Sequence, residues 1–386
     1  MAAGQRPPAD LSKFISVDDF QDYARAHMDK ARYEYVASGT EDEQTLQENR
    51  AAFKRFFLVP RFMRDVSKID TAVDVLGHRA SLPVLVSPAG VHNICHPQGE
   101  VGCARACARA GTIMAVSQHA NSTLEEVAAA AGGAPQWFQL YILKDRALTR
   151  DIVRRAVAAG YKALVLTIDS ARFGYREADA RNGFVGLPEG LSLPNYPTRE
   201  GYDDRDREAW DQNTERIFDT TCDWSEIAWL RSITTLPIVI KGVMAPEDAT
   251  LAVQAGASCI IVSNHGGRAL DGCLASIDAL GPVVAAVREQ CFRSDMVPVP
   301  VMMDGGVRRG TDVLKALALG ATAVLLGRPV FFALATAGED GVFKMLQLLR
   351  RELETAMVLT GCRSLAEIGP ELVVHRAPYA FQRSSL

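Results

Sequence analysis

An imidazole and a guanidinium stand close together in the run SNHGGR at residues 263–268. His265 can take up or release a proton near neutral pH, and Arg268 carries a permanent charge with forked donors that suit a carboxylate. A histidine that stands alone is more often structural than functional. His265 follows an apolar run and precedes Arg268 by three positions. This placement favours a functional role, with the histidine as an acid-base group and the arginine as a binding group for an anion.

Two later runs have the residues of a phosphate site, DGGVRRG at 304–310 and LGRP at 326–329. Glycines let backbone N–H groups approach a phosphate, and arginines add charge and forked hydrogen bonds. Either run alone could be an ordinary turn. Together they predict a phosphate site made of Gly306, Arg308, Gly327 and Arg328. There is no G-x-G-x-x-G and no Walker A pattern, which disfavours a dinucleotide fold and a P-loop.

Eight short apolar runs supply the strands that must position these side chains. They are residues 82–86, 112–116, 137–140, 163–168, 236–241, 259–263, 299–303 and 323–326. Continuous apolar strands are typical of a parallel sheet buried on both faces. Helical patterns separate them, for example at 276–289 and 311–319. Eight such units predict an α/β fold, a closed (β/α)8 TIM barrel, rather than an open sheet.

The 386 residues are expected to form one domain, 1–386, because α/β barrels of this size fold as a single unit. A mainly helical segment, 1–60, precedes the barrel. The polar, turn-rich segment 177–223 follows the fourth strand and is longer than ordinary connections. We expect a lid-like loop or a mobile excursion there, and we assign it no secondary structure.

Polar and glycine-rich residues gather directly after the ends of these strands. They are Ser87, Pro88, Ala89, Gly90, Ser117, Gln139, Tyr141, Thr167, Asp169, Lys241, His265 to Arg268, Asp304 to Arg308, Gly327 and Arg328. In a TIM barrel the carboxyl ends of all strands open at one mouth, where barrel enzymes hold their chemistry. The sequence therefore predicts one site built from residues far apart in the chain.

Composition excludes several classes of protein. With 46 acidic and 42 basic residues the formal charge is −4, so no overall basic field attracts nucleic acid. No apolar run reaches the roughly 18 residues of a membrane span, and the first residues lack the apolar core of a secretory signal. We expect no nucleic-acid partner, no membrane partner and an intracellular, cytoplasmic protein.

The cysteines and histidines do not form a metal or disulfide framework. Eight cysteines are scattered through expected helices and strands, which is typical of reduced thiols. The run HNICH at 92–96 has no distant partner pair at zinc spacing, so we predict no metal site. The sequon at Asn121 is read as accidental, since no signal peptide accompanies it.

The chain resembles the FMN-dependent 2-hydroxy acid oxidase family, which includes glycolate oxidase and lactate oxidase, from about Phe14 to Met357. The shared motifs are SNHGGR at 263–268, YEYVASG at 33–39, FQLY at 138–141, KG at 241–242, DGGVRRG at 304–310 and LGRP at 326–329. By this resemblance His265 is the catalytic base and Asp169 orients it.

The resemblance also implies the rest of the site. Arg268 and Arg176 would clamp the substrate carboxylate, while Tyr35 and Tyr141 would donate hydrogen bonds to the substrate. Lys241 would lie near the flavin N1/O2 edge, and we count Tyr141 and Lys241 with the catalytic residues. The FMN contacts implied are Pro88, Ala89, Gly90, Ser117, Gln139, Thr167, Lys241, Ser263, Asp304, Gly306, Arg308, Gly327 and Arg328.

The function implied is FMN-dependent oxidation of short L-2-hydroxy acids to 2-keto acids, with oxygen reduced to hydrogen peroxide. The alternatives are a lactate 2-monooxygenase, a dehydrogenase that uses another electron acceptor, or a barrel without activity. The family commonly forms tetramers or octamers, so we expect a homo-oligomer. The C-terminus, Ser384-Ser385-Leu386, is similar to a peroxisomal S-K-L signal, which predicts a peroxisomal location unless the tail carries no information.

Two positions depart from the glycolate oxidase pattern. Gly90 replaces an alanine, as in lactate monooxygenases, and His119 replaces a tryptophan. Both changes would remove bulk on the methyl side of the pocket, so we expect L-lactate to be favoured over glycolate. In the alternative reading the loop at Gly90 needs a flexible backbone and His119 faces solvent, and neither residue informs specificity.

Overall fold

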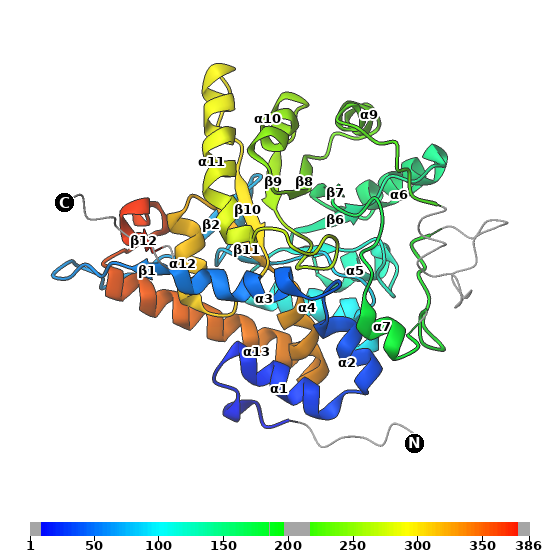
Figure 1. The fold of residues 1–386 in the computed structure, drawn as a ribbon, viewed down its shortest axis with the longest axis horizontal. Helices are drawn as coiled ribbons and strands as arrows, with labels where there is room; N and C mark the ends of the chain where they lie inside the picture. The colour runs from blue at the N-terminus through cyan, green and yellow to red at the C-terminus, as the bar shows by residue number, and fades with distance from the viewer. Residues whose placement is uncertain (1–8, 185, 197–216, 377–386) are drawn as a thin grey trace, which may run out of the picture.

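The computed structural model describes residues 9–184, 186–196 and 217–376, and its centre is a closed barrel of eight parallel strands (Figure 1). The strands are β4 (Val84–Val86), β5 (Met114–Val116), β6 (Gln136–Leu140), β7 (Ala163–Thr167), β8 (Ile238–Val243), β9 (Cys259–Val262), β10 (Val301–Asp304) and β11 (Ala323–Leu326). The barrel closes where β11 pairs with β4. The predicted TIM barrel and all eight expected strands are confirmed.

Helices surround the barrel and cover the outer faces of its strands (Figure 1). They are α4 (Gly99–Ala110), α5 (Leu124–Ala130), α6 (Arg146–Ala158), α9 (Ser225–Ile233), α10 (Pro246–Gln254), α11 (Ser276–Arg293), α12 (Gly310–Ala318) and α13 (Arg328–Thr360). α10 begins with proline at its first position and two acidic residues, which suit the positive end of the helix dipole. α13 bends at Ala337 and Gly338, where the backbone leaves the helical region.

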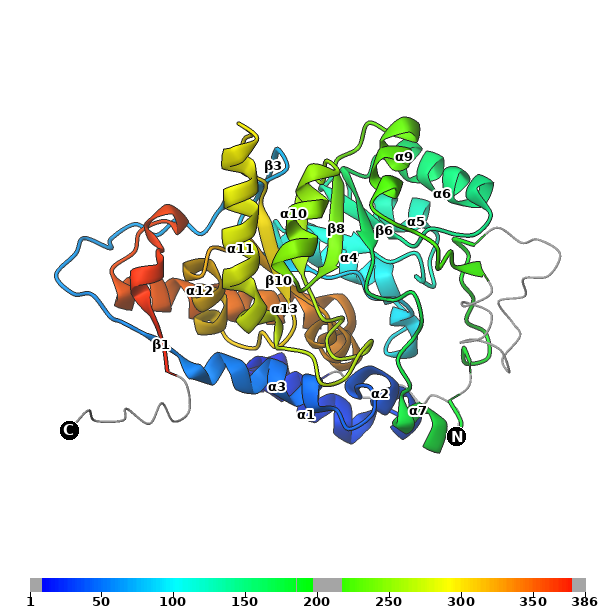
Figure 2. The same ribbon diagram turned by 45° about the horizontal axis from the view of Figure 1, so that its top comes forward.

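Three N-terminal helices precede the barrel, α1 (Val17–His27), α2 (Lys30–Ala37) and α3 (Gln44–Ala51). α1 packs against α13, and Figure 2 shows this layer on one side of the barrel. Beyond it, β1 (Phe56–Leu58) pairs antiparallel with β12 (Val373–His375), so the start and the end of the barrel domain lie side by side. The expected N-terminal helical segment is present.

A β-hairpin closes the amino end of the barrel. β2 (Val73–Val75) pairs with β3 (His78–Ala80), and Val75 and Ala80 are fully buried. They pack with the inward side chains of the barrel, among them Trp137 and Met302. A second, larger core fills the space between barrel and helices. The amino end is therefore packed shut, which leaves the carboxyl mouth for chemistry.

The segment 177–223 is more ordered at its start than expected. It carries α7 (Glu177–Arg181), although the sequence analysis assigned it no secondary structure, and α7 packs against α2. Leu143 forms an isolated bridge with Phe218 near the end of the segment. Residues 197–216, the middle of the expected lid, lie outside the described residues.

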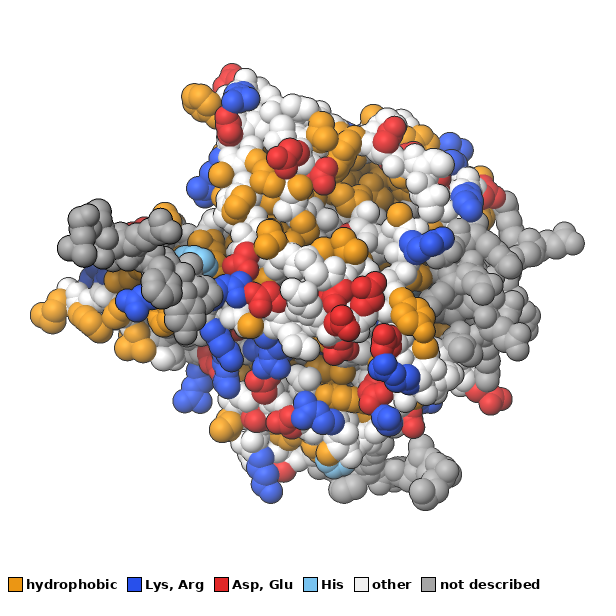
Figure 3. Space-filling view, viewed as in Figure 1, with side chains coloured by type: hydrophobic (Ala, Val, Ile, Leu, Met, Phe, Trp, Pro, Cys, Tyr) orange, Lys and Arg blue, Asp and Glu red, His pale blue; other side chains and the backbone are white. Residues whose placement is uncertain are grey.

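Neither the cysteines nor the charged side chains of the surface form a special arrangement in the described residues. All eight cysteines are free thiols. Acidic and basic side chains are interspersed over the face seen in Figure 3. Within the described ranges, no helix combines the length and the apolar character that a membrane crossing requires, and no group of three His, Cys, Asp or Glu side chains could hold a metal ion.

The packing of the hairpin generates a test of stability. Val75→Ala should lower the free energy of unfolding by about 2 kcal/mol, because it removes methyl groups from the dry floor of the barrel and leaves a cavity. Val73→Ala, the same change at a half-buried position of the same strand, is the matched control and should cost less. Chemical unfolding of both variants checks this, and equal losses would contradict the role given to the hairpin.

Candidate active site

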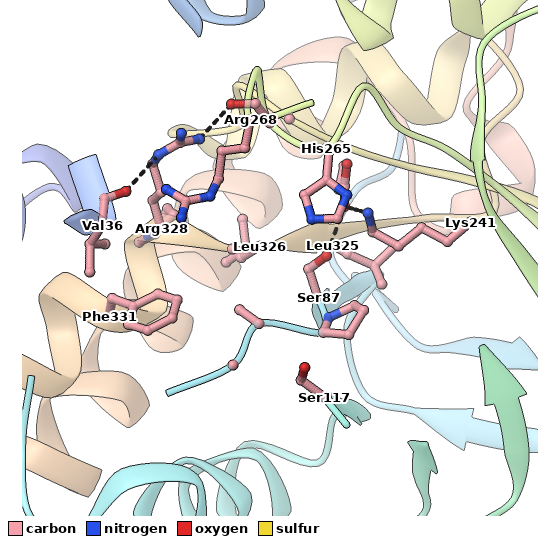
Figure 4. A pocket seen from close by; sticks show the side chains of 18 of the residues that line it. Val36, Ser87, Ser117, Lys241, His265, Arg268, Leu325, Leu326, Arg328 and Phe331 are labelled. Atoms are coloured by element: carbon pink, nitrogen blue, oxygen red, sulfur yellow. Dashed lines mark hydrogen bonds and ion pairs between the residues drawn. The ribbon is translucent and has the colours of Figure 1, made fainter. Parts of the chain in front are cut away.

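A cleft opens at the carboxyl mouth of the barrel (Figure 4). Of the residues expected from the sequence, those lining it are Tyr35, Pro88, Ala89, Gly90, Ser117, Gln139, Tyr141, Thr167, Arg176, Lys241, His265, Arg268, Asp304, Gly306, Arg308, Gly327 and Arg328. Asp169 and Ser263 do not line the cleft. They lie directly behind it, where they hold His265 and Lys241.

His265 is held from behind by a carboxylate. Its Nδ1 lies 2.7 Å from Oδ1 of Asp169, and its backbone N–H donates to Oγ of Ser263. Its φ of +55° lies in the left-handed region, an uncommon conformation that marks functional sites when the surroundings enforce it. With Nδ1 bound to Asp169, Nε2 is the nitrogen left to act in the cleft.

Asp169 is ionised although it is buried. Burial alone would raise its pKa, but the adjacent His265 and Lys241 lower it well below its usual range. Lys241 Nζ lies 3.7 Å from Oδ2 of Asp169 and 3.7 Å from Oδ2 of Asp304. These two carboxylates overcome the effect of burial on Lys241 and raise its pKa. Lys241 is therefore a permanent cation at the edge of the cleft.

Glycine at position 242 makes this arrangement possible. A Cβ there would lie 2.7 Å from Cβ of Asp169, and the φ of Gly242 is +114°. The strand that carries Lys241 can therefore approach Asp169 closely only because the next residue has no side chain. The glycine of the KG motif at 241–242 is therefore required by the close approach of the two segments.

Two arginines lie close to the ring of Tyr35, which also lines the cleft. The guanidinium carbons of Arg176 and Arg268 lie 5.4 Å and 5.1 Å from the centre of its ring. Arg268 also donates to the Tyr35 carbonyl at 2.7 Å, and Arg176 pairs with Asp179 at 2.5 Å. Burial and the neighbouring Arg176 lower the pKa of Arg268, so the pair would be stabilised by an anion between them.

Arg308 and Arg328 add two more half-buried cations. Burial, and then the repulsion of nearby arginines, lowers the pKa of Arg308 to about 10 and that of Arg328 to about 9. Arg328 donates to the carbonyls of Val36, Ser38 and Gly266, which joins the end of α2 to the mouth (Figure 4). Arg308 lies 3.8 Å from Asp18. Such a concentration of half-buried positive charge fits a phosphate.

The donor set also fits an isoalloxazine ring. Oε1 of Gln139 accepts hydrogen bonds from Oγ of Ser117 and from the N–H of Gln118, each at 3.2 Å. This leaves Nε2 of Gln139 buried beside the cleft without a partner among the described residues. A buried donor without a partner is rare in a finished structure. The carbonyl and nitrogen edges of a flavin would satisfy it, so the residues present fit FMN.

Gly90 lies directly against His119. This contact corrects the expectation that the glycine removes bulk from the substrate pocket. A Cβ on Gly90 would lie 2.5 Å from Cβ of His119 and 2.8 Å from its carbonyl oxygen. The missing methyl therefore allows two loops to touch and does not by itself widen the pocket. His119 is only 8% exposed, so the alternative that it faces solvent is wrong.

The His119 ring belongs to an aromatic wall of the cleft. Its centre lies 5.4 Å from that of Tyr141, 5.5 Å from that of Tyr196 and 5.9 Å from that of Phe218. Burial, with a smaller effect of His265, lowers its pKa to about 3. His119 is therefore neutral near physiological pH, and this wall carries no charge.

Sequence reasoning missed several supporting residues. Oγ of Ser170 lies 3.0 Å from Nδ1 of His265 and 3.1 Å from Oδ1 of Asp169. Its place next to Asp169 was the available signal. Asn49 and Asn264 exchange two hydrogen bonds of 2.9 Å and join α3 to the end of β9. No local pattern indicates that pair, because 215 positions separate its members.

Comparison with known proteins agrees with this geometry. The family model described as FMN-dependent dehydrogenase matches residues 24–375. Glycolate oxidase 5 of Oryza sativa subsp. japonica is 48% identical over 95% of this chain and 97% of its own length, and glycolate oxidase of Spinacia oleracea is 48% identical over 92% and 94%. A crystal structure of mandelate oxidase with (S)-4-hydroxymandelic acid superimposes with a TM-score of 0.84, at 41% identity over 93% of this chain and 98% of that one. The chain therefore belongs to the FMN-dependent dehydrogenase family, and its cofactor is FMN.

Proposed function

We propose that this FMN-dependent 2-hydroxy acid oxidase favours L-lactate over glycolate, and that it forms 2-keto acids and hydrogen peroxide. The observation that carries the proposal is the 2.7 Å contact between His265 and Asp169 in a cleft also lined by Arg268 and Arg176. A base that faces an anion clamp suits a substrate with a hydroxyl group next to a carboxylate.

The side chains have distinct roles in the proposed reaction. Arg268 and Arg176 bind the carboxylate, and His265 takes the hydroxyl proton while Asp169 stabilises the imidazolium that forms. Burial and Asp169 raise the pKa of Tyr141, so it stays protonated and can donate a hydrogen bond, as Tyr35 can, to the substrate. A bound FMN would supply a two-electron acceptor for this oxidation, and oxygen is the proposed final acceptor.

The remaining lining residues would hold the cofactor. Lys241 places positive charge near the flavin N1/O2 edge, and Arg308 and Arg328 bind the phosphate with the backbone of Gly306 and Gly327. The other FMN contacts proposed are Pro88, Ala89, Gly90, Ser117, Gln139, Thr167 and Asp304. Ser263, which was expected among them, lies behind the cleft, where it accepts a hydrogen bond from Lys241.

His119 supports the preference for lactate. An imidazole occupies less of the wall than the indole of the glycolate oxidase pattern, so space remains for the lactate methyl group. The neutral state of His119 keeps that space suitable for an apolar substituent. Relatives named glycolate oxidase and a neighbour named mandelate oxidase mark the small and large ends of the range of acids to test.

The electron acceptor, location and assembly are also proposals. Oxygen is the proposed acceptor, with lactate 2-monooxygenase and dehydrogenase activity as alternatives that product analysis separates. A homo-oligomer, tetramer or octamer, is proposed from the family resemblance. A peroxisomal location rests on Ser384-Ser385-Leu386, which lie outside the described residues.

The cofactor site predicts one FMN per chain. Acid release from the purified protein, followed by mass measurement and absorbance, should give FMN at a ratio near one. Arg328→Ala should lower the FMN content, because it removes a half-buried cation from the phosphate region. FAD, NAD or no flavin in folded protein would contradict this site.

His265→Ala should keep its FMN and lose about 100- to 10,000-fold in turnover, since the base acts on the substrate and not on cofactor binding. His27→Ala, which changes an exposed histidine on α1, is the control and should behave like the parent protein. Stopped-flow measurement of flavin bleaching under nitrogen separates the chemical step from reoxidation. Near-normal bleaching in His265→Ala would remove the role given to this residue.

The parent protein should oxidise L-lactate with a kcat/KM about 10- to 200-fold above that for glycolate, the range expected for one buried methyl group. His119→Ala should shift the preference further towards L-2-hydroxybutyrate, because it enlarges the same space. Steady-state rates with all three acids, with keto acid and peroxide both quantified, provide the measurement. Glycolate as the better substrate would refute the preference, and acetate with carbon dioxide would identify a monooxygenase.

A further inference from the structure

Helix α4 carries a buried carboxylate that the chemistry above does not use. Glu100 lies in its first turn and is 0% exposed. Oε1 accepts one hydrogen bond from the N–H of His92 at 2.9 Å and another from the N–H of Asn121 at 3.2 Å. A carboxylate is expensive to bury, and hydrogen bonds to N–H groups and a position at a helix N-terminus offset that cost.

The two N–H groups belong to different loops of the mouth, one after β4 and one after β5. Further hydrogen bonds join these loops. The N–H of Val91 donates to the carbonyl of His119 at 3.0 Å, and the N–H of Asn93 donates to Oδ1 of Asn121 at 3.2 Å. The loops are thus joined directly after the point where Gly90 touches His119.

The β4 loop is strained at this junction. Val91 has a φ of +59°, in the left-handed region that β-branched side chains avoid. Such a conformation persists only where surrounding contacts impose it. Glu100 binds the next residue along the chain, His92, whose ring packs against Phe331 of the cleft at 4.6 Å between centres. Loss of this contact would allow Val91 to relax and Gly90 to move away from His119.

We propose that Glu100 is a positioning residue that joins the β4 and β5 loops and so sets the place of His119 in the substrate wall. This inference rests on the proposed function. Glu100 would control which side chains the cleft accepts, while the base and the carboxylate clamp stay in place because other loops carry them. His265 and Arg268 follow β9, and Arg176 follows β7.

Substitution by glutamine separates the hydrogen-bond geometry from the charge. Oε2 of Glu100 has no hydrogen-bond partner among the described residues, so an amide nitrogen can replace it without removing a contact. Glu100→Gln should therefore hold both loops, and Glu100→Ala should release them. Arg105→Ala, which breaks a 2.7 Å pair with Glu339 elsewhere on α4, controls for general weakening of the helix.

Hydrogen exchange and kinetics of the FMN-loaded proteins provide the test. In Glu100→Ala, backbone amides in 87–94 and 117–121 should exchange about tenfold faster or more, while Glu100→Gln and Arg105→Ala stay near the parent. The lactate-to-glycolate ratio of kcat/KM should fall about tenfold in Glu100→Ala, mainly through KM, and recover in Glu100→Gln. If Glu100→Ala does not fold, Glu100→Asp, which shortens the reach, should give the same changes in part.

Unchanged exchange and an unchanged ratio in Glu100→Ala or Glu100→Asp would overturn the proposal, as would Glu100→Gln with the same loss as Glu100→Ala. The exchange measurement does not depend on turnover. If the parent protein oxidised neither acid, the proposed function would fail, while faster exchange confined to the two loops would still support the joining role of Glu100.

Discussion

One nearly buried carboxylate, that of Asp169, is the group on which the arrangement of the mouth depends. It stays ionised because Lys241 in β8 and His265 after β9 face it. Thr167 at the end of β7 pairs with Lys241 in β8. Because Asp169 follows Thr167 by two residues, this register places its carboxylate beside the ammonium group of Lys241. A slip of that register would leave a buried charge without a partner, which proteins avoid strongly. The chemistry of the site and the register of the barrel therefore support each other.

A second feature of the mouth is its excess of positive charge. Arg268, Arg308 and Arg328 are all half-buried in the same region, and the loss of solvent around each guanidinium lowers its pKa. Backbone carbonyls at the end of α2 partly compensate Arg328, which makes the N-terminal helices part of the site and not an appendage. Bound anions would complete the balance, and we propose the FMN phosphate and a substrate carboxylate in this role. The stability of the mouth is accordingly linked to the binding of its ligands.

The residues proposed to select the substrate are held in place differently from the proposed catalytic base. His265 and Lys241 come from strand ends held by the barrel itself, whereas His119 and Gly90 lie on loops held by contacts between loops and by Glu100. Loop contacts can change without disturbing the barrel, so this division allows acid preference to vary while the oxidation chemistry is kept. Relatives named for glycolate and for mandelate on one fold are consistent with such a division.

The barrel could be predicted from the sequence, because eight continuous apolar runs and the helical patterns between them are local signals. The residues that meet at the mouth could be predicted as well, since a closed parallel barrel brings the carboxyl ends of all its strands to one mouth. The contacts that these residues make could not be predicted, because they depend on how distant segments pack. The pairing of β1 with β12, the hydrogen bonds between Asn49 and Asn264, and the contact of Gly90 with His119 join positions that no local pattern relates. Gly90 illustrates why such contacts cannot be predicted from the sequence. The sequence shows that a methyl group is missing at this position, but the packing of the two loops shows that His119 occupies the space and that it is not open.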